Sequence, residues 1–197
     1  MKYLVAAALV AAGLSAPASA ADDSVTYRIE AHGGWDRVTV GGGGEDGALY
    51  GIGIGIDIPV SATAFIGFEG NADLSSVKEC VSFTNPPFFG RVCDQAKRDL
   101  SAVARLGANI GGGLKLYVLG GYTNARIRET STVIFGGFGG PITTVTSGSA
   151  NGDGWRAGAG AEVKLGGSAY TKLEYRYSNY EGGFQRHQIV AGLGLGL

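Results

Sequence analysis

Residues 169–178 decide the fold, and they read Ala169-Tyr170-Thr171-Lys172-Leu173-Glu174-Tyr175-Arg176-Tyr177-Ser178. Small or apolar residues occupy the odd positions, while Lys172, Glu174 and Arg176 lie at even positions between them. Successive side chains of a β-strand point to opposite faces of the sheet. Strict alternation therefore predicts a strand with one face in an apolar setting and the other in a polar one.

Seven other segments follow the same period of two, at 25–36, 50–58, 64–73, 100–110, 114–127, 155–165 and 188–197. Together with residues 169–178 they predict eight strands. In the fifth strand, 114–127, the residues 116–119 are apolar at both parities. The sequence therefore leaves the facing of that strand unassigned.

Composition excludes several classes of protein. The chain has 197 residues, including 36 Gly, with 45% hydrophobic residues and a formal net charge of −1. This length predicts one domain, and the balanced charge disfavours a nucleic-acid partner. Glycine without a period of three excludes collagen, and the hydrophobic content argues against disorder. No run of eighteen apolar residues follows position 20, which excludes a bundle of membrane-spanning helices.

The first twenty residues are typical of an export signal. Lys2 supplies a positive charge, residues 3–14 are apolar, and Ala18-Ser19-Ala20 fits the small-x-small rule for cleavage. A membrane-spanning helix is the alternative, but the apolar stretch is too short for it. We therefore predict a signal peptide at 1–20, a mature domain at 21–197, and a location where disulfides can form.

The lengths of the connections favour a membrane barrel. Long connections are expected at 38–47, 75–98 and 128–152, short ones at 59–62, 111–113 and 166–168, and a moderate one at 179–183. Short turns on one rim and long loops on the other are typical of outer-membrane barrels. The sequence thus predicts an all-β, eight-stranded antiparallel up-and-down transmembrane β-barrel. A soluble barrel would have to fit the large apolar side chains into a narrow interior, which is less favourable.

Large aromatic side chains lie on the apolar face near the rim of the long connections. Trp35, Tyr50, Trp155 and Tyr177 are therefore predicted to form an aromatic girdle at the membrane interface. Ordinary core aromatics are the alternative interpretation.

The polar face carries charges about half-way along the strands, where they are expected inside the barrel. These charges are Glu30, Glu69, Arg105, Glu162, Lys172, Glu174 and Arg176. Because isolated buried charges are costly, the favoured interpretation is a salt-bridged plug. A narrow charged channel, or a gate made by rearranging these pairs, is the alternative. Glycines at the same parity would leave room for the long side chains.

Two cysteines, Cys80 and Cys93, lie thirteen residues apart in the second long connection. In an oxidising compartment this spacing predicts a disulfide that ties a hairpin, whereas two cysteines without a nearby His are poor metal ligands. Phe83, Phe88 and Phe89 in the same connection are interpreted as a cap under the disulfide, with an adhesive tip as the alternative.

No arrangement in the sequence predicts catalysis. The glycines Gly42-x-Gly44-x-x-Gly47 match the dinucleotide fingerprint by letter, but they lie before a strand instead of opening a helix. His32 and His187 are the only histidines, no Ser lies in register beside His187, and no Gly-x-Ser-x-Gly elbow exists. We therefore expect no enzyme, no cofactor and no metal site.

The signal peptide, the eight strands and two motifs carry a resemblance to a known family. Residues 170–180 read YTKLEYRYSNY, and residues 187–197 read HQIVAGLGLGL. These features resemble the OmpA-like, opacity-type outer-membrane β-barrels, which are known as porin family proteins. The resemblance implies a location in the cell outer membrane, contact with outer-membrane lipid, and insertion by the barrel assembly machinery through the last strand. Family members usually end in an aromatic residue, whereas this chain ends in Leu197, which bears on the efficiency of insertion more than on the fold.

Three functions remain as expectations. The first is a structural, surface-exposed protein that helps maintain the integrity of the envelope. The second is a pore for ions or small solutes, as the family's porin label suggests. The third is adhesion through the loops to a surface partner that the sequence does not identify.

Overall fold

A computed structural model describes residues 24–137 and 140–197 of the chain. In these ranges it forms nine strands: β1 (Thr26–Val40), β2 (Gly43–Pro59), β3 (Ala64–Ser75), β4 (Lys78–Asn85), β5 (Phe88–Gly111), β6 (Leu114–Gly137), β7 (Gly140–Gly166), β8 (Ala169–Tyr180) and β9 (Phe184–Gly196). The described residues include no helix that is long and apolar enough to cross a membrane. The predicted signal peptide, residues 1–20, lies outside them.

Eight of the nine described strands close into a ring of antiparallel neighbours. The order is β1-β2-β3-β5-β6-β7-β8-β9, and β1 returns to pair with β9, where Trp35 lies opposite Ile189. The fourth strand, β4, is outside this ring because β3 pairs directly with β5, and β4 pairs with a different part of β5. The predicted eight-stranded up-and-down barrel is therefore confirmed, with β4 as an additional strand.

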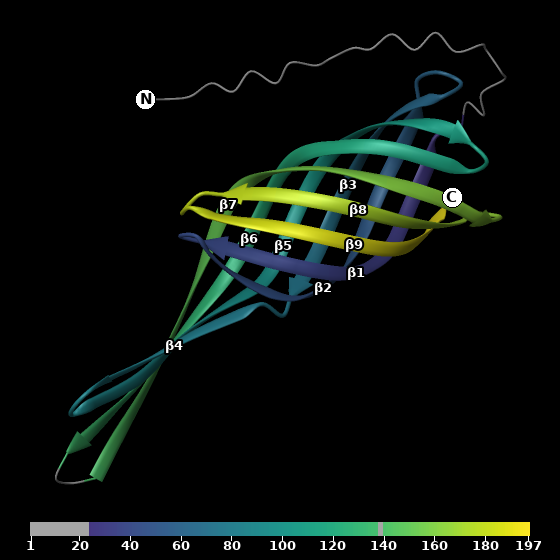
Figure 1. Cartoon of the computed structure of the whole chain (residues 1–197). Helices are drawn as coiled ribbons and strands as arrows, with labels where there is room; N and C mark the ends of the chain where they lie inside the picture. The colour runs from purple at the N-terminus through teal and green to yellow at the C-terminus, as the bar shows by residue number, and fades with distance from the viewer. Residues whose placement is uncertain (1–23, 138–139) are drawn as a thin grey trace, which may run out of the picture.

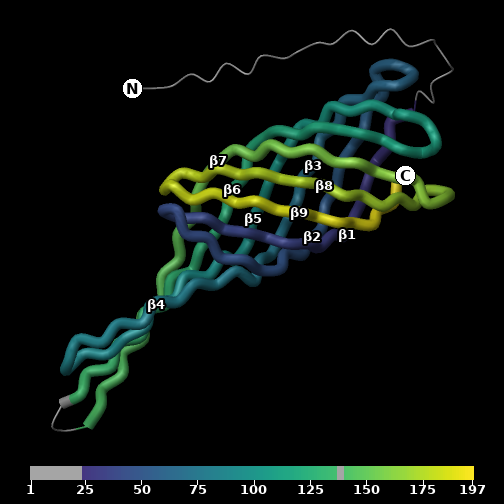
Figure 2. The backbone as a smooth tube through the Cα atoms, in the orientation of Figure 1, coloured from purple at the N-terminus to yellow at the C-terminus, as the bar shows by residue number. Residues whose placement is uncertain are grey.

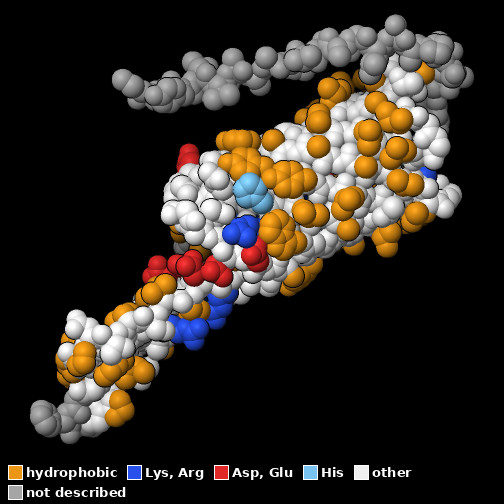
Figure 3. Space-filling view, in the orientation of Figure 1, with side chains coloured by type: hydrophobic (Ala, Val, Ile, Leu, Met, Phe, Trp, Pro, Cys, Tyr) orange, Lys and Arg blue, Asp and Glu red, His pale blue; other side chains and the backbone are white. Residues whose placement is uncertain are grey.

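Alternation sets which side chains face outward. On β2, the side chains of Ile52 and Ile54 are 62% and 64% exposed, and on β9 that of Leu193 is 63% exposed. Figure 3 shows hydrophobic side chains spread over the outer surface of the barrel. The opposite parity of the same strands faces the barrel axis. The apolar face is therefore the outer face, as a lipid-exposed barrel requires.

The facing of β6, which the sequence left unassigned, is set by its register with β5 and β7. Tyr117 and Leu119 are buried inside the barrel, whereas Leu116 and Val118 are exposed on the outer face. Tyr117 and Leu119 pack in a small apolar cluster that includes Phe65. The interior is thus partly aromatic and aliphatic, not purely polar.

Two intervals that were expected to be loops are strands. The intervals 75–98 and 128–152 contain β4, the first part of β5, the last part of β6 and the first part of β7. These pieces pair side by side as a four-stranded sheet. We call residues 78–96, 126–137 and 140–152 the extension. It projects from the barrel at the end opposite the C-terminus (Figures 1 and 2).

The extension leaves the barrel where its flanking strands end. Ser75 ends β3, and Tyr180 ends β8, so neither strand pairs with β5 or β7 beyond that level. A register irregularity in the β5–β6 pairing between Ala96 and Asp99 lies at the same level. Such bulges bend and twist a strand pair, which directs the extension away from the ring.

The connection expected at 38–47 is also shorter than predicted. β1 and β2 pair as far as Val40 and Gly43, so only Gly41 and Gly42 form the turn. Both have positive φ, at 57° and 90°. Two-residue hairpin turns of this kind need positive φ at both central positions, which glycine adopts without strain. The two glycines therefore replace the expected loop with a tight turn.

Candidate functional site: the charged barrel interior and the extension

All seven charges predicted for the interior lie inside the barrel. Each is at most 5% exposed: Glu30, Glu69, Arg105, Glu162, Lys172, Glu174 and Arg176. Within the described residues, ion pairs join these and further buried charges in three successive sets, which we call the inner, middle and outer layers. The inner layer is nearest the short turns, and the outer layer is nearest the extension.

The inner layer is a square of two cations and two anions. Arg28 donates to Glu162 Oε1 at 3.0 Å and to Glu69 Oε2 at 2.7 Å. Arg105 donates to the same two carboxylates, at 2.5 Å and 3.2 Å respectively. The four residues come from β1, β3, β5 and β7. The strands β3 and β5 are neighbours in the ring, whereas other strands separate β1 and β7 from them and from each other. Their side chains therefore meet across the barrel axis instead of lying along one wall.

Asp57 adds a third carboxylate to the inner layer. One of its oxygens lies 3.3 Å from Arg28 Nε and 3.4 Å from Lys115 Nζ. The guanidinium of Arg105 also stacks over the ring of Tyr117, 3.8 Å from its centroid. Cations in this layer are thus held by carboxylates on several sides and by an aromatic face.

The middle layer joins β8 to the rest of the interior. Lys172 pairs with Glu30 and lies 3.5 Å from Glu69, so it links the middle and inner layers. Arg176 pairs with Glu174 and donates to Asp73 at 3.1 Å. These contacts connect alternate residues of one strand with β1 and β3.

A histidine lies between two carboxylates of the middle layer. His32 Nδ1 is 3.2 Å from Glu30 Oε1, and its Nε2 is 2.6 Å from Asp73 Oδ1. Tyr170 donates to Glu30 at 3.0 Å, and Tyr117 donates to Glu174 at 2.6 Å. The carboxylates therefore accept hydrogen bonds from neutral donors as well as from cations, which offsets the cost of burying them.

The outer layer consists mainly of residues that the sequence analysis did not select. Arg156 donates to Asp99 at 2.6 Å, and Arg186 donates to the same carboxylate at 2.9 Å. Arg186 also donates to Asp36, through Nε at 3.1 Å. Tyr180 adds a hydrogen bond to Asp99 at 2.7 Å.

Two reasons account for this omission. Asp36 and Arg156, like Arg28 of the inner layer, lie at the polar parity of predicted strands, so that parity alone could have identified them. Asp99 and Arg186 lie just before the segments 100–110 and 188–197 and fell outside the predicted strands. The pairings in the structure extend both strands to include them.

Glycines in the interior leave space for the layers. A Cβ built on Gly53 would lie 2.7 Å from Asn71 Oδ1 and 2.9 Å from Glu30 Oε1. A Cβ on Gly194 would lie 2.3 Å from the ring of Tyr170. Side chains from neighbouring strands therefore occupy the volume above these glycines.

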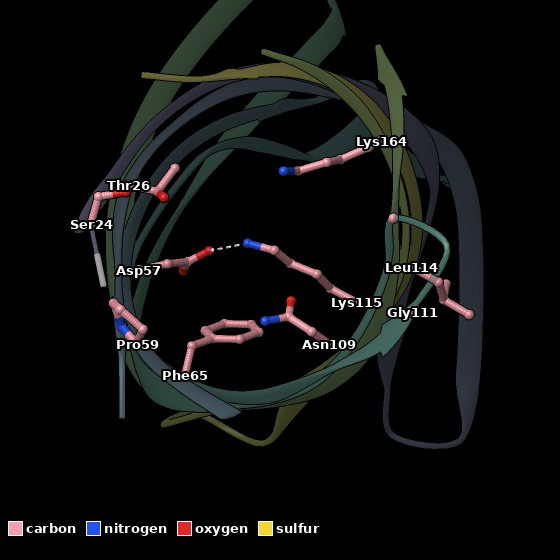
Figure 4. Close-up of a pocket in the computed structure, with 11 residues that line it drawn as sticks. Ser24, Thr26, Asp57, Pro59, Phe65, Asn109, Gly111, Leu114, Lys115 and Lys164 are labelled. Atoms are coloured by element: carbon pink, nitrogen blue, oxygen red, sulfur yellow. Dashed lines mark hydrogen bonds and ion pairs between the residues drawn. The ribbon is translucent and has the colours of Figure 1, made fainter. Parts of the chain in front are cut away.

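A cavity of about 240 Å³ opens at the rim of the short turns, and residues that line it are shown in Figure 4. Lys115 points across it toward Asp57, and Lys164 extends into it from the same side as Lys115. An adjoining cavity of about 350 Å³ reaches Arg28 and Glu162 of the inner layer. The described residues contain no group of three or more His, Cys, Asp or Glu side chains that could hold a metal ion.

The four residues predicted for the girdle lie on the outer face near the outer layer. Trp35, Tyr50 and Trp155 are 38%, 58% and 52% exposed, whereas Tyr177 is half-buried. Tyr177 lies between two neighbours, with its ring centroid 5.4 Å from that of Trp155 and 5.1 Å from that of His187. Tyr122 pairs with Trp155 across the β6–β7 ladder and is also exposed.

The predicted disulfide joins Cys80 of β4 to Cys93 of β5 and ties the edge strand of the extension to its neighbour. The expectation of a cap under it is wrong, because Phe83, Phe88 and Phe89 lie between the disulfide and the tip and are 40–46% exposed. Phe88 packs against Phe135 of β6, with the ring centroids 5.3 Å apart.

Comparison with known proteins agrees with this geometry. The family model described as outer membrane protein beta-barrel domain matches residues 6–196. The chain belongs to this family. It is therefore an outer-membrane β-barrel protein, and the predicted resemblance and location are confirmed. No curated protein matches the chain.

Solved structures share the fold at low sequence identity. Ail, the attachment invasion locus protein of Yersinia pestis, superposes with a TM-score of 0.56 and 14% identity over 88% of this chain and 97% of that one. Neisserial surface protein A has a TM-score of 0.51 and 12% identity over 87% of this chain and 98% of that one.

Proposed function

We propose that this protein is a non-conducting anchor that displays the extension at the bacterial surface and has a structural role in the envelope. The observation that carries the proposal is the buried ion-pair network, which occupies the barrel from the inner to the outer layer. Lys172 connects the inner and middle layers, and Arg156, 3.7 Å from Asp73, connects the middle and outer layers. No catalytic role is proposed, because cations neutralise the interior carboxylates.

The size and burial of the network support a plug over a pore. The side chains of Arg105, Arg176 and Glu174 are 0% exposed, so no continuous water-filled path passes beside them. Eight-stranded barrels have interiors that side chains just fill. Opening a channel would require several buried ion pairs to separate at the same time. Each separated pair would leave a buried charge without a partner, which is energetically costly.

Single-channel recording tests this proposal. Refolded protein, shown to be a closed barrel by its gel mobility shift, is expected to give no discrete conductance steps in a planar bilayer. Glu69→Gln and Arg105→Gln probe the inner layer, and Arg37→Gln, at an exposed pair, is the control. Discrete steps in the wild type that change in the two interior variants, and not in the control, would show that the charges line a pore.

The structural role predicts a cellular phenotype. Cells that lack the protein are expected to become more sensitive to detergents and large antibiotics that the outer membrane normally excludes. The complete chain and a chain without the extension are both expected to restore resistance. Unchanged sensitivity in the deletion strain would contradict an envelope role.

Attachment to another surface is a second candidate, and the extension is the observation that favours it. Its outer edges, β4 and residues 140–152 of β7, each pair on one side only. Residues 140–152 carry no charge. Unpaired strand edges are templates for binding an extended segment of another chain. Ail, which shares the fold, is named for attachment and invasion.

Trimming the extension tests this second candidate. Glu79 lies opposite Asp94, and Glu129 lies opposite Gly148, so each pair can be joined by a two-residue Asn-Gly turn. The trimmed chain lacks residues 80–93 and 130–147 and keeps the ring. Bacteria that display it are expected to lose attachment to cultured cells. Attachment equal to that of the complete chain would exclude the extension as the binding element.

A further inference from the structure

The base of the extension separates its charges by face. Lys78 lies opposite Gln95, which lies opposite Arg128, so these three side chains share one face of the sheet. The next row toward the tip contains three carboxylates, Glu79, Asp94 and Glu129, on the other face. Figure 3 shows the acidic and basic side chains at the base gathered on different sides.

The basic face is continuous with the lipid-facing surface of the barrel. Arg126 and Arg128 share the parity of Tyr122, which is exposed on the outer face. Arg98 lies opposite Leu74, a side chain that is 47% exposed on that face. All of these basic side chains therefore point outward, away from the barrel axis.

The cations on this face have no anionic partner of their own. Among the ion pairs of the described residues, none includes Lys78, Arg98 or Arg128. Arg126 donates to Ser149 at 3.1 Å, which leaves its charge uncompensated. The nearest row of carboxylates cannot reach them, because it lies on the opposite face. On the other face, Glu79, Asp94 and Glu129 lie directly opposite one another, and like charges placed in this way destabilise a sheet. The arrangement therefore does not serve the folding of the extension.

The height of Arg126 along its strand places it beside the polar layer of a membrane. Arg98 lies opposite Leu74, which lies opposite Tyr50, so Arg98 is two strands away from an aromatic residue of the predicted girdle. Arg126 is four residues beyond Tyr122, which at a strand rise of about 3.4 Å and a tilt of about 45° places it roughly 10 Å higher. The headgroup layer extends about 5–8 Å beyond the hydrocarbon on each side of a bilayer. Long Arg side chains span the small difference.

We propose that the outward basic face, formed by Lys78, Arg98, Arg126 and Arg128, binds phosphate groups of lipid headgroups in the outer leaflet. Guanidinium groups donate two parallel hydrogen bonds to a phosphate, which makes arginine well suited to this contact. The carboxylate face is repelled by the same phosphates. The two faces together tilt the extension so that its basic side lies toward the membrane surface. This inference depends on the membrane location, not on whether the barrel conducts.

Binding of lipid A tests the proposal. The complete chain is folded in phosphatidylcholine nanodiscs that contain either bisphosphorylated lipid A or the same lipid without its phosphates, and the lipid retained on the protein is measured. Wild type is expected to retain the phosphorylated lipid at least tenfold better. The triple variant Arg98→Gln/Arg126→Gln/Arg128→Gln is expected to reduce this preference below threefold, since all three guanidinium groups of the face are gone.

The carboxylate face provides the matched control. The variant Glu79→Gln/Asp94→Asn/Glu129→Gln changes three charges on β4, β5 and β6 at the base of the extension and is expected to keep the preference of the wild type. A gel mobility shift confirms that each variant forms the barrel. The proposal is overturned if the arginine variant keeps the full preference, or if wild type does not discriminate between the two lipids. Loss of heparin binding in the arginine variant with unchanged lipid retention would instead assign the face to a sulfated glycan.

Discussion

Replacing Glu162 with Gln tests whether the interior charges hold the barrel together. Glu162 Oε1 accepts from Arg28 at 3.0 Å and from Arg105 at 2.5 Å, and the carboxylate is 4% exposed. Glutamine has nearly the same shape, so the variant creates no cavity. It removes one of the three carboxylates that the guanidinium groups share and leaves them with Glu69 and Asp57.

The expected loss is set by the burial of the pair. Removing one partner of a buried ion pair costs about 3–5 kcal/mol, because the remaining charge stays buried without compensation. The control is Asp46→Asn at the exposed pair Arg37–Asp46, whose side chains are 44% and 49% exposed and whose atoms are 3.2 Å apart. Exposed pairs contribute about 0–1 kcal/mol.

Urea unfolding of protein in phospholipid vesicles measures both variants, with tryptophan fluorescence and the gel mobility shift as independent probes. The double variant Glu162→Gln/Arg105→Gln is expected to lose less than the sum of the single losses, because it no longer holds an excess cation. A loss below about 1 kcal/mol for Glu162→Gln, equal to that of the surface control, would refute the reasoning.

Two further predictions follow from individual contacts. Replacing Cys80 and Cys93 with Ser is expected to leave barrel stability unchanged and to speed proteolysis of the extension, because the disulfide constrains only β4 and β5. Mass mapping of the fragments locates the cuts. Equal cleavage rates with and without the disulfide would exclude a role of the disulfide in protecting the extension. Gly194→Ala is expected to destabilise the barrel by about 1–3 kcal/mol, because its Cβ would lie 2.3 Å from the Tyr170 ring. Gly148→Ala is the control, since its Cβ would meet nothing within 4 Å, and equal unfolding midpoints for the two variants would contradict the packing argument.

The interior was predictable because one face of each barrel strand lies in lipid. Where Leu173 and Tyr175 alternate with Lys172 and Glu174, the apolar residues identify the lipid-facing side of the strand and the charged residues identify the interior side. The same logic failed on β6, where residues 116–119 are apolar at both parities. There, Tyr117 and Leu119 belong to an apolar cluster inside the barrel, which obscures the alternation.

The extension was mistaken for loops because both of its faces meet water. Residues 140–152 include Ile142, Thr143, Thr144 and Val145, which favour strands, but no buried face imposes a period of two. Its strands exist because β5, β6 and β7 continue pairing beyond the ring. Pairing depends on the neighbouring strands, so the sequence of one segment does not by itself indicate that the segment is paired.

The sequence by itself determined that the chain contains strands with one apolar and one charged face. It therefore also determined that the chain forms a membrane barrel with charges inside. Only the tertiary structure decided which charges meet. Arg186 and Asp36 are paired although they are 150 residues apart, because closure of the ring sets the stagger of every strand. The departure of the extension from the ring has the same origin, since it depends on where the neighbouring strands end.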